Sequence, residues 1–225
     1  MNRYTLAWCD QYLDELLDKI GSDYFPLPIK LDRFITATYD FLRDRTKSLE
    51  ITQEISDDLK PLLKTRKLSI LKSEMSIYSK NTWNCPEPID YYRLIGLVPV
   101  YVDVDLKEKI KSKKTQIIQS GQRESYSRDP FRNGTAEYPN IIREANLFSI
   151  DVGEDSTTYT SAIITYIKKP LFAKEDEETK RIVDLNDSAI DQILLKTSDY
   201  LRFGVFDENA ANNFQFNSQF GEYNK

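Results

Sequence analysis

The spacing of apolar residues changes twice along this chain, and each change limits the fold. Residues 5–48 repeat apolar side chains at the 3.6-residue period of an amphipathic helix, and residues 187–203 do the same. Residues 66–170 instead contain short runs rich in Tyr, Ile, Leu and Val, which are typical of strands. Helices, then strands, then one helix predict an α+β fold with antiparallel pairing rather than alternating βαβ units.

At 225 residues the chain is long enough to bury one good core. We therefore expect a single α+β domain over residues 1–204, followed by an extended polar tail over residues 205–225. Within the domain we expect an N-terminal helical hairpin over 5–48, an antiparallel β-sheet over 66–170 and a C-terminal helix over 187–203.

The N-terminal helices have recognisable ends. Thr5 can cap the first helix and Gly21 can end it, while Pro28 suits the start of the second. The helical segment that follows is expected to be short or broken, because it contains Pro61. Cys9 falls on the apolar face of the first helix, which favours a buried small hydrophobe over a reactive thiol.

Strands and loops alternate in the middle of the chain. The expected strands are residues 67–79, 91–104, 109–121, 141–153 and 158–172. Residues 80–90 are expected to form a loop stiffened by prolines, and residues 122–140 a long irregular loop of the kind that binds a partner or folds late. The last two strands are expected to pair as a hairpin around residues 153–157.

The last of these strands ends in Lys168, Lys169 and Pro170. Proline has no N–H to donate to a strand ladder, and lysines discourage accidental pairing at a sheet edge. We expect these three residues to close the strand. Within it, Ile163 and Ile167 are expected to face away from the side that carries Ala162, Ile164 and Tyr166.

The composition argues against several classes of function. No histidine is present, so the commonest general base and the commonest transition-metal ligand are both missing. A net charge of -5 argues against a protein that mainly grips phosphates. Asp10 interrupts any signal-peptide core, and no apolar run approaches the roughly 20 residues that span a bilayer. We expect no catalytic residue, no metal, no cofactor and no membrane partner.

Several carboxylate pairs are candidates for catalytic dyads. They are Asp57 with Asp58, Asp103 with Asp105, and the acidic run 175–178. A hydrolase dyad needs two carboxylates in different environments across a cleft, and adjacent acidic residues in solvated segments do not suggest one. Asp103 and Asp105 also lack the further ligands of a calcium loop.

Two segments of opposite charge stand out. The basic segment runs from Lys107 to Lys114, and the acidic run includes Glu175 and Glu177. The basic segment could contact nucleic acid, but no aromatic residue interleaves with its lysines, so a solvated strand edge is favoured. A third interpretation is that the two segments are complementary surfaces of neighbouring copies, because head-to-tail contacts can close into rings.

Two other segments are candidates for contacts. The long loop contains Asp129 and Phe131. The tail is either a disordered C-terminus or a segment that orders on a partner, with Phe214, Phe216 and Phe220 as its anchors.

The order of several short motifs resembles the ring or neck proteins of crAss-like bacteriophages, part of the wider group of head-to-tail connectors (tail adaptors) in short-tailed phages. The resemblance covers roughly Thr5 to Gly204. The motifs are YFPLP after the first helix, SDDLKPLLK, PIDYYRLIGLVPVYVD, SRDPFRNGTAEYP, ITYIKKP and the closing helix before a polar tail.

This resemblance implies a virion structural protein in a dodecameric ring below the portal, extending the DNA channel and docking the tail. Its implied partners are further copies of itself, the portal protein, other ring proteins and tail proteins, with DNA passing through without specific binding. The strand ending in Lys168, Lys169 and Pro170 would run toward a neighbouring copy or the next ring, and the long loop and the tail would be contact arms. The implied location is the neck or tail of the virion, after assembly in the host cytoplasm.

Three alternatives stay open at this point. A tail-barrel or capsid-decorating protein of the same kind of phage would bind tail components and never the portal. A histidine-free hydrolase would use two of the carboxylates against a substrate such as cell-wall glycan. A host-directed binding module would be missing from purified particles.

Overall fold

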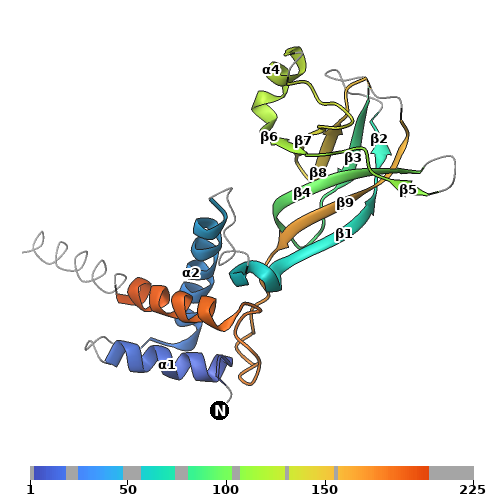
Figure 1. The fold of residues 1–225 in the computed structure, drawn as a ribbon. Coiled ribbons are helices and arrows are strands. Elements are labelled where there is room, and N and C mark those ends of the chain that lie inside the picture. The colour runs from blue at the N-terminus through green and yellow to red at the C-terminus, as the bar shows by residue number, and fades with distance from the viewer. Residues whose placement is uncertain are drawn as a thin grey trace, which may run out of the picture. The chain divides into compact units, whose positions relative to one another are not determined.

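The computed structural model describes residues 3–18, 25–47, 57–73, 81–102, 107–129, 132–154 and 157–202. Both helices and antiparallel sheets are present, which confirms the predicted α+β class. The chain divides into two compact units, Met1–Leu62 with Pro170–Lys225 (the helical unit) and Leu63–Lys169 (the sheet unit), as Figure 1 shows. We expected one domain over residues 1–204. That the two units unfold together as one domain stays a prediction.

Long helices make up most of the described part of the helical unit. They are α1 (Leu6–Asp18), α2 (Leu27–Lys47) and a helix at 187–202, drawn in orange in Figure 1. Their positions agree with the predicted hairpin and C-terminal helix. Each helix buries one apolar face, made of Leu6, Cys9, Leu13, Leu17, Phe34, Ala37, Leu42, Ile190, Ile193, Leu194 and Leu201.

Side-chain caps fix the starts of two helices. The Thr5 hydroxyl accepts the backbone N–H of Trp8 at 3.4 Å, which confirms the predicted cap of α1. The Asn186 side-chain oxygen accepts the backbone N–H of Ala189 at 2.8 Å and caps the helix at 187–202 in the same way. Gly21, predicted to end the first helix, lies outside the described residues.

Two prolines lie where the sequence predicts a helix start and a short or broken helix. Pro28 is the second residue of α2. Residues 57–59 form a single helical turn that continues as the 3-10 segment η1 (Lys60–Leu62), which contains Pro61. The predicted short or broken helix is therefore confirmed.

A buried lysine joins α1 to α2. Lys30 is only 1% exposed, and its ammonium lies 2.8 Å from the Asp10 carboxylate and 2.5 Å from that of Asp14. Burial alone would lower the pKa of Lys30, but the hydrogen bonds that its ammonium donates to both carboxylates outweigh it and raise the pKa above its ordinary value. The ammonium therefore stays charged inside the unit, and its two partners set how the helices lie against each other.

The sheet unit consists of two β-sheets. Its strands are β1 (Leu63–Ser69), β2 (Leu71–Lys72), β3 (Thr82–Pro86), β4 (Tyr91–Val102), β5 (Glu108–Lys109), β6 (Gln116–Ile118), β7 (Asn140–Glu144), β8 (Leu147–Asp151) and β9 (Tyr159–Lys168). One sheet has the order β1-β9-β4-β5 and is antiparallel throughout. The other has the order β2-β3-β8-β7-β6, in which only the β6–β7 pair is parallel.

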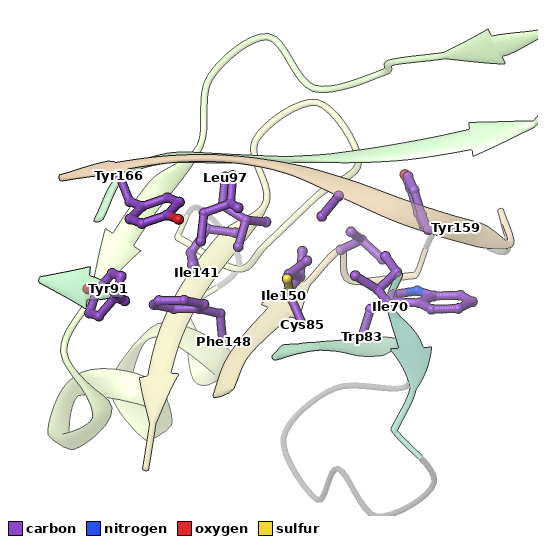
Figure 2. Packing of buried hydrophobic residues seen from close by; sticks show 13 residues of the cluster. Ile70, Trp83, Cys85, Tyr91, Leu97, Ile141, Phe148, Ile150, Tyr159 and Tyr166 are labelled. Atoms are coloured by element: carbon purple, nitrogen blue, oxygen red, sulfur yellow. The ribbon is translucent and has the colours of Figure 1, made fainter. Parts of the chain in front are cut away.

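The core of this unit lies between the two sheets. Figure 2 shows side chains of β9 and β4 pointing toward those of β3, β7 and β8. Aromatic rings meet edge to face across the gap, with centroids 5.2 Å apart for Tyr91 and Phe148 and 5.8 Å apart for Trp83 and Tyr159. The remaining core residues are Ile70, Cys85, Leu97, Ile141, Ile150, Val152, Ala162, Ile164 and Tyr166.

The predicted loop over residues 80–90 was wrong, because β3 lies within it. Asn84 and Pro86 are rare in strands and masked the signal. Trp83 and Cys85 alternate with them and both enter the core, so packing outweighs local preference. Pro86 is the last residue of the strand, where a missing N–H is tolerated.

The predicted hairpin around residues 153–157 was also wrong. The turn lies earlier, at Ala145 and Asn146, where β7 turns into its antiparallel partner β8. Ala145 adopts a φ of 46°, a conformation that alanine seldom takes, so the turn lacked its usual glycine signal. β9 belongs to the other sheet and pairs with β1 and β4.

The long loop over residues 122–140 is less irregular than expected. It begins with η2 (Ser120–Gln122) and the short helix α4 (Arg123–Arg128). Farther along, Gly134 lies so close to the backbone of Asp151 that a Cβ would overlap its carbonyl oxygen. Gly153, with a φ of 67°, lies just as close to the Gly134 carbonyl, so this part of the loop is attached to the end of β8.

Both cysteines are buried and free, and the prediction for Cys9 is confirmed. Burial raises the pKa of the Cys9 thiol to about 12 and that of Cys85 to about 11, so both thiols are weak nucleophiles at neutral pH.

Within the described part of the chain, the helices are all too short or too polar to cross a bilayer.

Replacing the buried lysine should loosen the helical unit. We expect Lys30→Met to lower the free energy of unfolding by about 3 kcal/mol, the low end for a broken buried pair, because Asp10 and Asp14 remain partly hydrated. Chemical denaturation followed by circular dichroism measures the change. Arg33→Met, at an exposed site on the same helix, is the control and should stay within about 0.5 kcal/mol. Equal effects of the two substitutions would contradict a stabilising role for Lys30.

Two glycines in the sheet unit should respond oppositely to alanine. Gly134→Ala is expected to destabilise by roughly 1–3 kcal/mol, because its Cβ would overlap the Asp151 carbonyl oxygen. Gly96→Ala in β4 is the matched control: nothing lies within 4 Å of the added Cβ, so stability should be unchanged or rise by up to about 1 kcal/mol. Thermal unfolding measures the stability of both variants. A Gly134→Ala protein as stable as the unsubstituted one would refute the close contact between the loop and the end of β8.

Candidate functional site

The basic segment forms an arm at one end of the sheet unit. Residues 107–114, here called the basic arm, begin at β5, which pairs with the end of β4 through Tyr101 and Val102. Residues 107–110 are all exposed, and Ile110 is 51% exposed between two lysines. Figure 1 places β5 at the outer end of the β4–β5 hairpin. The arm thus offers an apolar side chain flanked by positive charges.

Contacts with the sheet hold the arm at both ends. Glu108 forms an ion pair with Lys67 of β1. Lys111 donates to the Thr157 hydroxyl and lies 5.3 Å from the centroid of the Tyr101 ring. Farther along, Lys113 pairs with Glu137 at 2.7 Å. The arm is therefore a positioned element of the sheet unit.

The acidic loop of the helical unit is also ordered, and Glu177 organises it. The Glu177 carboxylate accepts the backbone N–H of Lys174 at 3.1 Å and the ammonium of Lys180 at 2.6 Å. These hydrogen bonds, that of Lys180 first, lower the pKa of Glu177. Glu177, predicted as a contact residue, is thus engaged within its own loop, whereas Glu175 is exposed.

An open groove runs between this loop and the start of α2. Its volume is about 490 Å³, within the range of roughly 300–1,000 Å³ that is usual for binding sites. The residues that line it, here called the acidic groove, are Pro28, Leu31, Asp32, Ile35, Lys174, Glu175 and Asp176. Of the two predicted acidic contacts, Glu175 alone lines it. The α2 side was missed because Ile35 fits the apolar stripe of the helix and was assigned to the core.

A second groove of about 460 Å³ lies farther along α2. Ion pairing and hydrogen bonding bridge it: Lys196 lies 3.3 Å from Asp44, and Arg45 donates to Gln192 at 3.0 Å. Arg45 also pairs with Asp58 at 3.2 Å, so the charged residues that line this groove are engaged within the helical unit.

The strand end that we expected to run toward a neighbour is held inside its own sheet. β9 pairs with β1 through Ile167 and with β4 through Lys168, so it is a central strand of its sheet, and it ends at Lys168 as predicted. The backbone N–H of Lys169 donates to the Asp90 carbonyl at 2.7 Å, and Pro170 is buried. A contact of Lys168 or Lys169 with another copy would be made by side chains and not by a strand edge.

Asp90 also fixes this strand end through its carboxylate. Its carboxylate accepts the Tyr166 hydroxyl at 2.7 Å and the Lys64 ammonium at 2.7 Å. Burial alone would raise the pKa of Asp90, but the hydrogen bonds from Lys64 and Tyr166 outweigh it and lower the pKa. Burial, together with the bond to Asp90, raises the pKa of Tyr166 to about 12.

The contact residues predicted in the loop and the tail are only partly described. Asp129 lies at the end of α4, where its carboxylate approaches the Arg132 guanidinium at 3.5 Å. Phe131 lies outside the described residues, and so do the three tail residues Phe214, Phe216 and Phe220. Their assignment as partner contacts stays a prediction.

The carboxylates considered as catalytic dyads lie in different settings. Asp58 is buried, accepts a hydrogen bond from Asn186 at 3.0 Å and pairs with Arg45 at 3.2 Å, so its surroundings are those of a structural link. Asp103 and Asp105 fall outside the described residues. In the described ranges, no group of three or more Cys, Asp or Glu residues could hold a metal ion.

No protein-family model matches the sequence, and no curated protein matches it.

The Asp90 network predicts a loss of stability at high pH. The proton of Tyr166 leaves near pH 12 in the folded protein, against an ordinary value of 10.0. Its contribution is therefore complete below pH 10 and is lost as pH rises toward 12. We expect Tyr166→Phe to flatten the fall in stability across this window and to cost about 1.5–3 kcal/mol at pH 7, as for a hydrogen bond to a charged group.

Denaturant unfolding at pH 7, 10 and 11.5 measures both effects. Tyr138→Phe, at an exposed site of the same unit, is the control and should follow the unsubstituted protein. Tyr200, whose pKa is also raised to about 12 by burial and by its bond to Asp40, titrates in the same window, so the difference between proteins is the informative quantity. A Tyr166→Phe protein with an unchanged pH profile would contradict the network.

Proposed function

We propose that this chain is a non-enzymatic structural protein that assembles head to tail into a ring. The observation that supports this most directly is the pair of exposed, oppositely charged surfaces in separate units of one chain. The basic arm belongs to the sheet unit and the acidic groove to the helical unit. Two different surfaces that complement each other generate a heterologous contact, which closes into a ring when the rotation between copies allows it.

The ring is proposed to be a segment of the neck of a short-tailed bacteriophage, stacked below the portal and extending the DNA channel. The support is the order of motifs from Thr5 to Gly204, which resembles crAss-like phage ring proteins. A net charge of -5 suits such a channel, because DNA must pass without being held. The resemblance implies twelve copies, with portal, other ring and tail proteins as partners.

Charge complementarity would contribute mainly to the register and the rate of assembly. Oppositely charged patches steer encounter and disfavour wrong orientations, whereas exposed ion pairs add little affinity each. Closing a ring makes up for this weakness, because every copy is then held at two contacts. In this proposal the long loop and the C-terminal tail bind the neighbouring components of the virion.

The first test is native mass spectrometry of the full chain, alone and mixed with its cognate portal oligomer. We expect one discrete complex that carries many copies of the chain, with weaker portal binding, about tenfold or more, when the chain is truncated after Gly204.

Proteomics of purified particles is the second measurement. The proposal requires the chain in the particles at a constant ratio to the portal protein. A chain that binds neither portal nor itself and is missing from particles would refute the proposal and favour the host-directed alternative.

A further inference from the structure

The acidic groove combines an apolar floor with a negative rim. Pro28, Leu31 and Ile35 follow one another on one face of α2 at helical spacing, and all three line the groove. Leu31 is buried, which fixes it in the helical unit, and Ile35 is half-buried, so a partner can contact it. Such a floor favours an occupant that inserts an aliphatic side chain.

The rim of the groove carries three carboxylates and one ammonium. Asp32 comes from α2, whereas Glu175 and Asp176 come from the acidic loop, and all three are exposed. Lys174 offsets one of these charges, which leaves the rim at about -2 (three negative, one positive). An occupant should therefore present positive charge on both sides of its apolar group.

The basic arm has this combination of properties. Ile110 is 51% exposed and can reach an apolar floor. Lys109 and Lys111 flank it, and Lys107 and Lys114 extend the positive charge on either side. The arm thus complements the groove in both apolar character and charge.

We propose that the acidic groove of one copy receives the basic arm of a second copy, with Ile110 on the floor beside Ile35 and the lysines facing Asp32, Glu175 and Asp176. This assignment rests on the proposed ring-forming function and names the contact that builds the ring. Groove and arm are different surfaces, so a copy that binds a neighbour through its arm keeps its own groove open for the next copy. The contact therefore propagates until the ring closes.

Disulfide trapping between two variants tests this contact. One full-length protein carries Ile110→Cys, the other carries Ile35→Cys, and the two are mixed under mild oxidation. A disulfide needs the two Cβ atoms within about 3.5–4.5 Å, so the covalent heterodimer reports close approach of arm and groove. Each chain has only one of the two introduced thiols, so a disulfide between the substituted positions 110 and 35 always joins two copies.

The matched control replaces the arm variant by Ile117→Cys. Ile117 lies on β6 of the same unit and is 48% exposed, close to the value for Ile110, but it is outside the basic arm. The native thiols should not interfere, because Cys9 and Cys85 are buried with raised pKa values. Circular dichroism checks that all three variants are folded.

We expect at least about tenfold more heterodimer from the Ile110→Cys and Ile35→Cys mixture than from the control mixture. The excess should shrink in 1 M salt, where the screening length falls to about 3 Å. Equal yields from both mixtures would overturn the inference, and this is also the result expected if the arm occupied the groove of its own chain.

Comparison with the unsubstituted chain separates this inference from the proposed function. A closed oligomer in native mass spectrometry together with trapping at the control level would overturn the arm-groove contact and leave the ring standing. Strong trapping without a closed oligomer would support the contact and count against the ring.

Discussion

The pairing of β1 with β9 is the constraint on which the rest of this architecture depends. It is antiparallel and in register from Leu63 opposite Ile167 to Ser69 opposite Ser161. The start of the first strand of the sheet unit thus lies beside the end of its last strand, and the chain enters and leaves this unit at neighbouring positions. That arrangement allows the helical unit to be built from two stretches more than 100 residues apart, joined for example by the bond from Asn186 to Asp58.

Both units are held by burial, but in different ways. The sheet unit relies on an aromatic and aliphatic core between its sheets, to which β9 contributes Tyr159, Ala162, Ile164 and Tyr166. The helical unit adds a buried charge, Lys30, whose two carboxylate partners come from the facing helix. A buried ion pair is a weak source of stability but a strict source of geometry, since other arrangements of the helices would leave the ammonium unpaired. The acidic groove at the start of α2 includes Leu31, the residue next to Lys30.

The candidate interface follows from where each unit places its charges. The basic arm lies at the end of a hairpin that is anchored through Glu108 and Lys111, and the acidic groove lies beside a loop organised by Glu177. In the basic arm and in the acidic loop, some charged residues form local pairs, and these pairs position the exposed charged residues beside them. Contacts between copies would thus be made by Ile110, Lys107 and Lys109 on one side and by Asp32, Glu175 and Asp176 on the other.

The parts that sequence predicted well are those whose signal is local. Apolar spacing was sufficient for α1, α2 and the helix at 187–202, and a run of β-branched and aromatic residues was sufficient for β4 and β9. β3 was missed because Asn84 and Pro86 disfavour strands locally, although Trp83 and Cys85 pack into the core. The β7–β8 turn was missed because Ala145, with its positive φ, replaces the usual glycine. In the candidate interface, the opposite charges were visible in sequence, but Ile35 could not be distinguished from a core residue.

The sequence by itself determined the fold class, the positions of the three long helices, the absence of histidine and the presence of two oppositely charged segments. Only the tertiary structure decided which strands pair, that β9 is central, that Lys30 is buried, and that residues 28–35 and 174–176 line one groove. The physical reason is the range of the forces involved. Helix periodicity and capping act over a few neighbours, whereas strand pairing, burial and groove formation join residues much farther apart in the sequence, which meet only when the chain folds.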